Sequence, residues 1–474
     1  MNLYLAGLLA YSISLILVGL YMGRRIKASS DFFVAGRSLG PGLIFTTFLA
    51  ANIGAGSTVG ATGLGYRFGL SAWWWVGSAA IGTFVLAAFV GPKLWEIARK
   101  HRLNTMGDFL QWRYNKAVRA LIAVLLWMGT LAILAGQLIA ISWILNVVIG
   151  LPKWIGCALG GAVAIAYCAA GGLLAAAYVN MIELAITMSG LLLAVPWALH
   201  AVGGWQQIVQ QVSAAHADSA VLFSLTGIGL KRILAYVAIL TPSFIVSPGL
   251  AQKLYGAKSS RAVKVGVGLN SLAQAAFAIV PAILGLCALA AFPRLSNPEL
   301  ALPMVMLKLL PTWLGVWALA SIFSAELSAT DAILFMLSTS LVVDLYKTFL
   351  NPKVSDRRLL SISRMTAIFA GVAGILLAGF LPSIIAAVTI FYGLLAVSLF
   401  VPVIAGLFWR KASSTAALAA IGAAIVAALL ATRFTKGGWW ILSPQAIGIA
   451  TAAIVVVVVT WLVPASAKAR AGRS

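Results

Sequence analysis

The sequence is dominated by apolar stretches that are long enough to cross a lipid bilayer as helices. A bilayer core about 30 Å thick needs roughly 20 apolar residues per helix. Thirteen stretches meet this requirement, over residues 3–22, 42–65, 70–95, 118–149, 153–171, 174–201, 230–250, 263–292, 312–346, 361–380, 384–409, 414–432 and 443–463. The sequence therefore predicts an all-α integral membrane protein with about thirteen transmembrane helices.

The composition argues against a soluble protein. Of 474 residues, 62% are hydrophobic and 9% are charged, whereas soluble domains carry roughly 25% charged residues. The composition therefore disfavours a soluble enzyme, a nucleic-acid-binding protein and a secreted disulfide-rich domain. Cys157, Cys168 and Cys287 lie in apolar stretches without paired spacing, so neither a disulfide framework nor a zinc site is predicted. The longest polar stretch, 203–224, is expected to hold a short surface helix.

The placement of lysine and arginine predicts the orientation of the helices. With the N-terminus outside, 25 Lys and Arg residues fall in inner segments and 8 in outer segments. The positive-inside rule therefore places the N-terminus outside and the C-terminus in the cytoplasm of a multi-pass protein of the cell membrane. Topology and contacts with anionic membrane lipid then explain the net charge of +23, so nucleic acid is not a predicted partner. No obligatory protein partner is predicted either.

Two of the apolar stretches contain residues that interrupt helices. Residues 50–60 are rich in glycine and small hydroxyl side chains, and residues 241–249 contain two prolines. Such breaks free backbone carbonyls inside the membrane, where unsatisfied polar groups are costly. The breaks lie in the first helix of two successive groups of five, 42–201 and 230–409. This arrangement is typical of an inverted-repeat transporter with its site near the midplane, although small residues also serve close helix packing.

Three carboxylates lie deep within the predicted spans, namely Glu183, Glu326 and Asp331. An intramembrane carboxylate usually faces a cavity, an ion or a proton path. Asp331 follows Ser328 by three residues, so both project from one side of their helix. Carboxylate, hydroxyl and freed carbonyl oxygens suit a small alkali cation. The alternative is that these carboxylates only brace neighbouring helices.

No pattern typical of an enzyme is present. The glycine run over 63–69 misses the spacing of a dinucleotide-binding motif, and the sequence has no phosphate-binding loop and no nucleophile elbow. No catalytic residue is therefore predicted, and the protein is not expected to be an enzyme.

Several motifs make the chain resemble the sodium:solute symporter family over roughly residues 5–412. They are Asp31–Gly40 (DFFVAGRSLG), Leu49–Gly54 (LAANIG) followed by Gly63–Tyr66, Gln252–Ser259, Ser328 through Asp344–Lys347, and Gly406–Lys411. The resemblance implies a LeuT-type core of two inverted five-helix repeats, 42–201 and 230–409, preceded by the helix at 3–22. Residues 413–474 would add two helices and a short basic cytoplasmic tail.

The resemblance also implies a sodium site. Its ligands would be the carbonyls of Ala50, Ile53 and Ala325 and the hydroxyl of Ser328. The next position, where the family has a second hydroxyl, is Ala329, which could offer only its backbone. Asp331 matches an aspartate of the choline-transporting branch and could replace the missing ligand.

Three further residues are candidates for coupling. Asn180 stands where members with an additional sodium site have an aspartate, which favours one sodium ion unless Glu183 reaches the same place. Glu326 is the third candidate. Because deep carboxylates also suit a proton path, a proton-coupled transporter on the same fold is an alternative.

The expected function is sodium-coupled symport of a small organic solute by alternating access, with a membrane solute sensor as a further alternative. The candidate lining residues are Gly54, Gly56, Ser57, Trp127, Gln137, Ser243, Phe244 and Thr389. Positions that hold sugar hydroxyls in the family are Ser57, Val76, Leu240 and Thr389 here, and each unmet buried hydroxyl costs about 1–3 kcal/mol. An organic acid, an amino acid or a quaternary amine is therefore favoured over a sugar.

Overall fold

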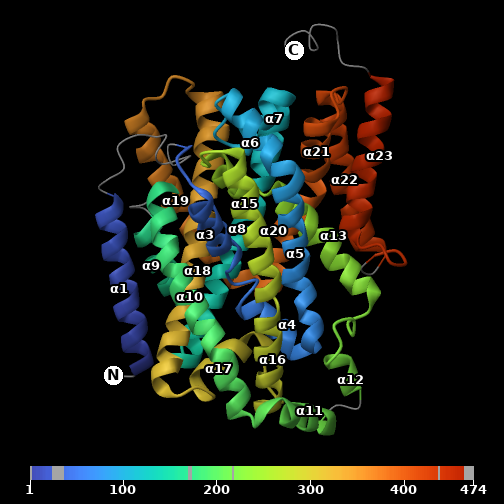
Figure 1. Cartoon of the computed structure of the whole chain (residues 1–474). Coiled ribbons are helices and arrows are strands. Elements are labelled where there is room, and N and C mark those ends of the chain that lie inside the picture. The colour runs from blue at the N-terminus through green and yellow to red at the C-terminus, as the bar shows by residue number, and fades with distance from the viewer. Residues whose placement is uncertain (1–2, 24–36, 169–172, 216–217, 436–437, 464–474) are drawn as a thin grey trace.

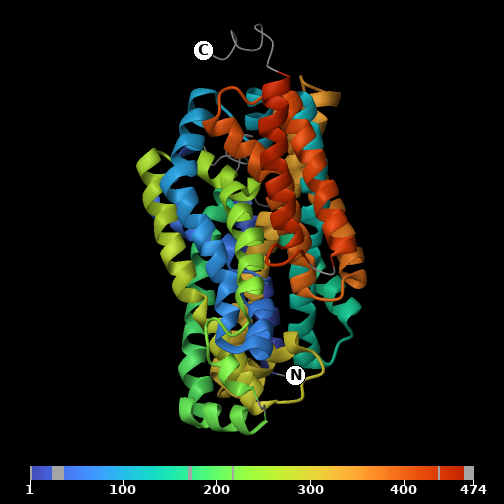
Figure 2. The same ribbon diagram turned by 90° about the vertical axis from the view of Figure 1, so that its right-hand side faces the viewer.

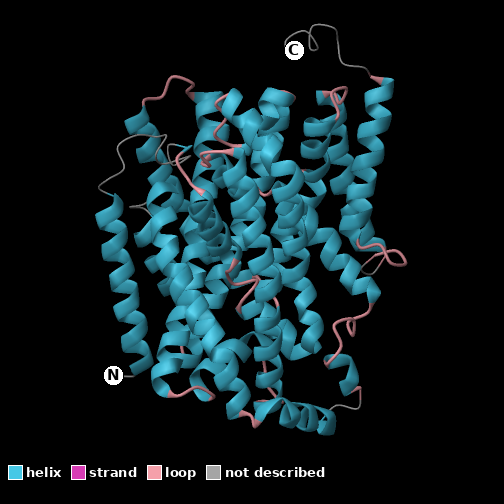
Figure 3. Ribbon diagram, viewed as in Figure 1, coloured by secondary structure: helices cyan, strands magenta, loops and turns pink. Residues whose placement is uncertain are grey.

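The computed structural model describes residues 3–23, 37–168, 173–215, 218–435 and 438–463, and these residues form an almost entirely helical protein (Figure 3). The helices of the first half are α1 (Leu3–Gly23), α3 (Pro41–Asn52), α4 (Val59–Phe68), η2 (Gly69–Ala72), α5 (Trp73–Val85), η3 (Leu86–Val90), α6 (Gly91–Lys100), α7 (Met106–Arg113), α8 (Lys116–Ile149), α9 (Lys153–Cys168), α10 (Leu173–Ala201), α11 (Gly204–Ala215) and α12 (Ser219–Leu222).

Those of the second half are α13 (Leu230–Val246), α14 (Pro248–Tyr255), α15 (Ser260–Phe277), α16 (Ile279–Ala291), η4 (Pro298–Leu300), α17 (Ala301–Lys308), α18 (Thr312–Thr339), η5 (Ser340–Leu350), α19 (Asp356–Phe380), α20 (Ile384–Ser398), α21 (Phe400–Phe408), α22 (Ser414–Phe434) and α23 (Pro444–Leu462).

Membrane-length helices account for the apolar pattern of the sequence. In the described part of the chain, 10 helical segments are long and apolar enough to cross a membrane. Shorter apolar helices lie at Leu3–Ser14, Pro41–Asn52 and Lys153–Ala166. Each of the predicted stretches overlaps one of these segments, and Val59–Lys100 overlaps two stretches. The prediction of an all-helical membrane protein is confirmed.

The long helices run side by side along one direction of the molecule (Figures 1 and 2). The Leu3 end of α1 and the Leu462 end of α23 lie at opposite ends of the bundle (Figure 1). Helices α11 and α12 lie at the same end as the start of α1, and they confirm the surface helix expected in the polar stretch 203–224. Helices α22 and α23 pair at the edge of the bundle against α20.

Both predicted helix breaks are present, but they differ in size. Helix α3 ends at Asn52 and α4 begins at Val59, so six residues separate them. Between α13 and α14 only Ser247 departs from helical geometry, with φ −53° and ψ 122°. This break is short because Pro248 occupies the first turn of α14, where its missing N–H needs no partner.

The chain segments beside the two breaks are joined at one end of the molecule. Leu39 and Ala257 form an isolated parallel bridge. The N–H of Leu39 donates to the carbonyl of Gly256 at 2.9 Å, and the N–H of Lys258 donates to the carbonyl of Leu39 at 2.9 Å. The segment that enters α3 is therefore tied to the segment that leaves α14.

A buried polar cluster lies near the same end. Arg119 on α8 forms ion pairs with Asp108 on α7 at 2.9 Å and with Asp344 on η5 at 2.7 Å. The hydroxyl of Thr105 donates to Asp344 at 2.6 Å. Gly107 allows this approach, because a Cβ there would collide with the Asp344 carboxylate.

Candidate functional site

The first break is held in place by side chains from two other helices. The N–H of Ala55 donates to Oε1 of Gln137 on α8 at 2.8 Å. The hydroxyl of Thr58 donates to Oε1 of Glu326 on α18 at 2.7 Å. Within the break, Ser57 donates to the carbonyl of Asn52 at 2.9 Å. These contacts fix an irregular backbone that would otherwise be unsatisfied inside the membrane.

A large cavity opens beside the two breaks and encloses roughly 1360 Å³, including the space at its mouth. It extends from Gly54 and Ser57, past Phe244 and Ser247 at the second break, to Ser338 at the end of α18. It therefore lies on the side of the breaks toward which α18 ends.

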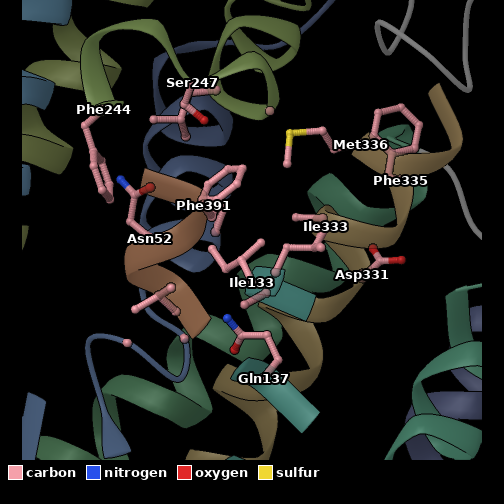
Figure 4. Close-up of a pocket in the computed structure, with 18 of the residues that line it drawn as sticks. Asn52, Ile133, Gln137, Phe244, Ser247, Asp331, Ile333, Phe335, Met336 and Phe391 are labelled. Atoms are coloured by element: carbon pink, nitrogen blue, oxygen red, sulfur yellow. The ribbon is translucent and has the colours of Figure 1, made fainter. Parts of the chain in front are cut away.

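The cavity wall combines aromatic rings with side-chain amides. Phe244 and Phe391 lie on one side of it, and Asn52 and Gln137 lie nearby (Figure 4). Trp75 also lines it, and its Nε1 donates to the carbonyl of Gly56 at 2.9 Å. Such a wall provides apolar contact with a few polar groups for orientation, as in most small-molecule sites.

The structure brings together most of the predicted lining residues. Gly54, Gly56, Ser57, Gln137 and Phe244 all line the cavity. The remaining predicted residues, Trp127, Ser243 and Thr389, are not among its lining residues. The first of these stacks on Phe369 with ring centroids 6.4 Å apart, and the second donates hydrogen bonds to the carbonyls of Ile239 and Tyr392.

Several lining residues were not singled out from the sequence. They include Asn52, Trp75, Lys253 and Phe391. Trp75 belongs to a run of three tryptophans that is also typical of an interfacial belt. Lys253 lies in a motif with other basic residues, which makes it look like a topology signal. Its position directly after a broken helix is the signal that could have identified it.

A second, small pocket contains the predicted cation ligands. Ala50 and Ile53, at the end of α3, lie there with Ala325 and Ser328 of α18. Glu183 of α10 lines the same pocket and is fully buried, and Ser328 hydrogen-bonds its side chain. The small pocket is therefore lined by a carboxyl group, a hydroxyl group and the residues at the end of α3.

The other predicted cation and coupling residues lie elsewhere. Asp331 and Ala329 line the large cavity instead of the small pocket. Glu326 faces the first break through Thr58. The side chain of Asn180 is outside the described part of the chain.

The family model for the sodium:solute symporters matches residues 32–424. The chain belongs to this family. It is therefore a multi-pass membrane transporter of a family that couples solute symport to sodium, and not an enzyme.

Named relatives in this family span most of the chain at low identity. The sodium/pantothenate symporter of Escherichia coli (strain K12) is 26% identical over 456 residues, which cover 90% of this chain and 90% of the relative. The high-affinity proline transporter PutP of Bacillus subtilis (strain 168) is 23% identical over 428 residues, covering 87% and 89%.

A solved member of this kind has the same fold as this symporter. The substrate-bound, outward-open structure of a Na⁺-coupled sialic acid symporter superposes with a TM-score of 0.82 at 19% identity, covering 98% of both chains. The crystal structure of MhsT in complex with L-phenylalanine superposes with a TM-score of 0.53 at 14% identity, covering 88% of this chain and 97% of that one. These likenesses confirm the predicted LeuT-type fold.

The donors in the small pocket of this symporter fit a sodium ion. Carbonyl, hydroxyl and carboxylate oxygens are the hard ligands that such cations prefer. Ala50 and Ile53 stand at the C-terminal end of α3, where the last carbonyls lack intrahelical partners and the helix dipole is negative. Glu183 brings a carboxyl group to the same pocket.

A buried polar contact lies on the other side of the breaks. Glu299 on η4 accepts hydrogen bonds from the N–H of Ile384 at 2.7 Å and from Nε1 of Trp143 at 3.1 Å. Burial raises the pKa of the Glu299 carboxyl above its ordinary value, and the two hydrogen bonds oppose that rise. This carboxyl links the segment before α17 to α8 and α20.

Proposed function

We propose that the protein moves a small organic solute into the cell together with sodium. The adjacency of the two pockets is the observation that supports this function. Ala50 and Ile53 belong to the small pocket, whereas Gly54 and Ser57 belong to the large cavity. A cation in the small pocket would order the first break, which forms part of the wall of the large cavity.

Thermodynamic linkage between the two binding sites then explains how sodium and solute binding are coupled. If sodium raises the affinity for the solute by ordering this break, the solute raises the affinity for sodium by the same factor. We assign sodium to the carbonyls of Ala50, Ile53 and Ala325, the hydroxyl of Ser328 and the carboxylate of Glu183. Asp331, one turn further along α18, lines the large cavity and remains a candidate ligand.

The solute classes favoured by the sequence suit the cavity. An organic acid, an amino acid or a quaternary amine fits a wall of aromatic rings and few hydroxyls better than a sugar does. The related transporters named above act on pantothenate and proline. Membrane lipid is the only other partner we propose.

Alternating access accounts for the closed and open sides. We place the N-terminus outside and the C-terminus in the cytoplasm, which makes the cavity inward-facing and the Glu299 contact the closed outer side. Rocking of one repeat against the other would break this contact and close the cavity toward α14 and the end of α18.

Proton coupling on the same fold is the second candidate, because Glu183, Glu326 and Asp331 are all buried. Uptake measurements in reconstituted proteoliposomes distinguish sodium coupling from proton coupling. Sodium and proton gradients are imposed one at a time while uptake of labelled organic acids, amino acids and quaternary amines is measured. Uptake driven by sodium alone supports our assignment, whereas uptake driven only by a proton gradient would overturn it.

A further inference from the structure

A lysine on the cavity wall points to the charge of the solute. Lys253 lies on α14, six residues after the second break at Ser247, and is only 4% exposed. It lines the large cavity. In the part of the chain that the structure describes, its ammonium makes no hydrogen bond and no ion pair within 4 Å. A buried charge is costly unless a partner compensates it, so this ammonium calls for an anion.

The charged groups of the cavity do not supply that anion. Asp331 also lines the wall, and its charge acts on Lys253, but the two side chains are not within ion-pair distance. The charge of Asp331 also acts on Glu183, so it serves the neighbouring cation pocket as well. The exposed Arg364 at the mouth is a second cation. The described wall thus carries two positive side chains and one carboxylate.

The rest of the wall defines the body of the solute. Trp75, Phe244 and Phe391 present aromatic surface to the cavity. Asn52 also lines the cavity (Figure 4), and its buried Nδ2 has no hydrogen-bond partner among the described residues. The residues that line the cavity therefore carry a second unused donor besides the ammonium, and donors favour an anionic acceptor.

We propose that the solute is a small carboxylate with an apolar or aromatic body, and that Lys253 binds its carboxylate group. This inference rests on the proposed function and narrows it. The ammonium repels a quaternary amine, whereas the aromatic rings alone would attract one. With sodium at the small pocket, one solute anion would also balance the excess positive charge of the cavity.

The test measures binding by thermal stabilisation of the purified full-length protein in saturating sodium. The probes are benzoate and butyrate, their uncharged amides benzamide and butyramide, and choline. We expect the carboxylates to stabilise the protein and the amides and choline to have no effect. Lys253→Gln should weaken carboxylate binding about tenfold or more, and Lys253→Arg should retain most of it.

Lys258→Gln is the matched control, because it removes the same charge at an exposed site five residues further on. It should bind the carboxylates as the unmodified protein does. Stabilisation by amides or choline to the same degree, no stabilisation by any carboxylate, or unchanged binding in Lys253→Gln would each overturn the assignment.

Stabilisation by sodium alone, measured without any probe, separates this inference from the proposed function. If sodium stabilises the protein but carboxylates are not preferred, the solute class is wrong and sodium coupling stands. If sodium has no effect while carboxylates bind through Lys253, the assignment of sodium as the coupling ion is wrong, and the assignment of a carboxylate solute is supported.

Discussion

The hydroxyl of Thr58 donates to Oε1 of Glu326 across 2.7 Å, and both side chains are buried. Thr58 directly precedes α4, at the end of the first break, and Glu326 lies on α18 between Ala325 and Ser328. The hydrogen bond therefore connects the irregular segment beside the cavity with the helix that supplies Ala325 and Ser328 to the small pocket. Through this hydrogen bond, a change of conformation at one pocket can affect the other.

We expect Thr58→Val to destabilise the protein by about 1–3 kcal/mol, because it keeps the shape but leaves a buried carboxyl oxygen without its donor. Thermal unfolding of Thr58→Val, Glu326→Gln and the double variant gives the coupling between the residues. The double variant should lose clearly less than the sum of the single losses. Strict additivity would show that the contact contributes nothing.

Sodium dependence should distinguish the carboxylates near the cation pocket. Glu183→Gln and Ser328→Ala should each raise the sodium concentration for half-maximal uptake, the first about tenfold or more, because a charge near a cation is worth more than 1.4 kcal/mol. Asp331→Asn should raise it less, because this side chain lines the cavity. A larger effect of Asp331→Asn than of Glu183→Gln would return Asp331 to the ligand set.

The Glu299 contact predicts a dependence of stability on pH. Its pKa is raised in the folded protein, so its contribution to stability is present below the ordinary value of about 4.3 and is lost as the pH rises through the raised value. Glu299→Gln does not titrate. The unfolding temperature of the unmodified protein should therefore fall relative to that of Glu299→Gln as the pH rises from about 4. Parallel curves for the two proteins would contradict this prediction.

Gly107→Ala should disturb the buried Arg119 cluster. The added Cβ would displace the Asp344 carboxylate from its ion pair, and we expect a loss of about 1–3 kcal/mol in the free energy of unfolding. Gly422→Ala is the control, because a Cβ there meets nothing within 4 Å. That change should be neutral or stabilising by up to about 1 kcal/mol. Equal unfolding temperatures for the two variants would refute the role of Gly107.

The orientation can be tested by labelling intact cells with a membrane-impermeant thiol reagent. A cysteine at the exposed position Lys353, between η5 and α19, should not react, whereas one at the exposed Gln207 on α11 should. The labelling uses protein in which Cys168 is replaced by serine, because that side chain lies outside the described part of the chain, whereas Cys157 and Cys287 are buried. Labelling at position 353 without labelling at position 207 would reverse the proposed topology.

The helices and their breaks could be predicted from the sequence because both depend on local composition. Apolar length defines a span, and glycine or proline inside it defines a break. The distribution of residues between two neighbouring pockets could not be predicted from the sequence. Ser328 and Asp331 are three residues apart on α18, yet Ser328 lines the small pocket with Glu183 of α10 and Asp331 lines the large cavity with Lys253 of α14.

The position of Lys253 in the cavity wall also could not be predicted from the sequence. Its sequence context is that of a basic loop, and only the packing of α14 beside the end of α18 turns it toward the cavity. Glu183 was recognised as deep in the membrane, but its contact with Ser328 depends on the packing of α10 against α18. Contacts between distant helices have no periodicity that a single sequence would reveal.

The bridge between Leu39 and Ala257 has a mechanical consequence for the transport cycle. The bridge links α3 and α14, the two half-helices on the cavity side of the breaks, so that movement of one carries the other with it. Since α3 ends at the small pocket and α14 carries Lys253, release of the ion and release of the solute would be linked in one movement. The bridge thus works against an uncoupled ion leak, in which an ion would cross without the solute.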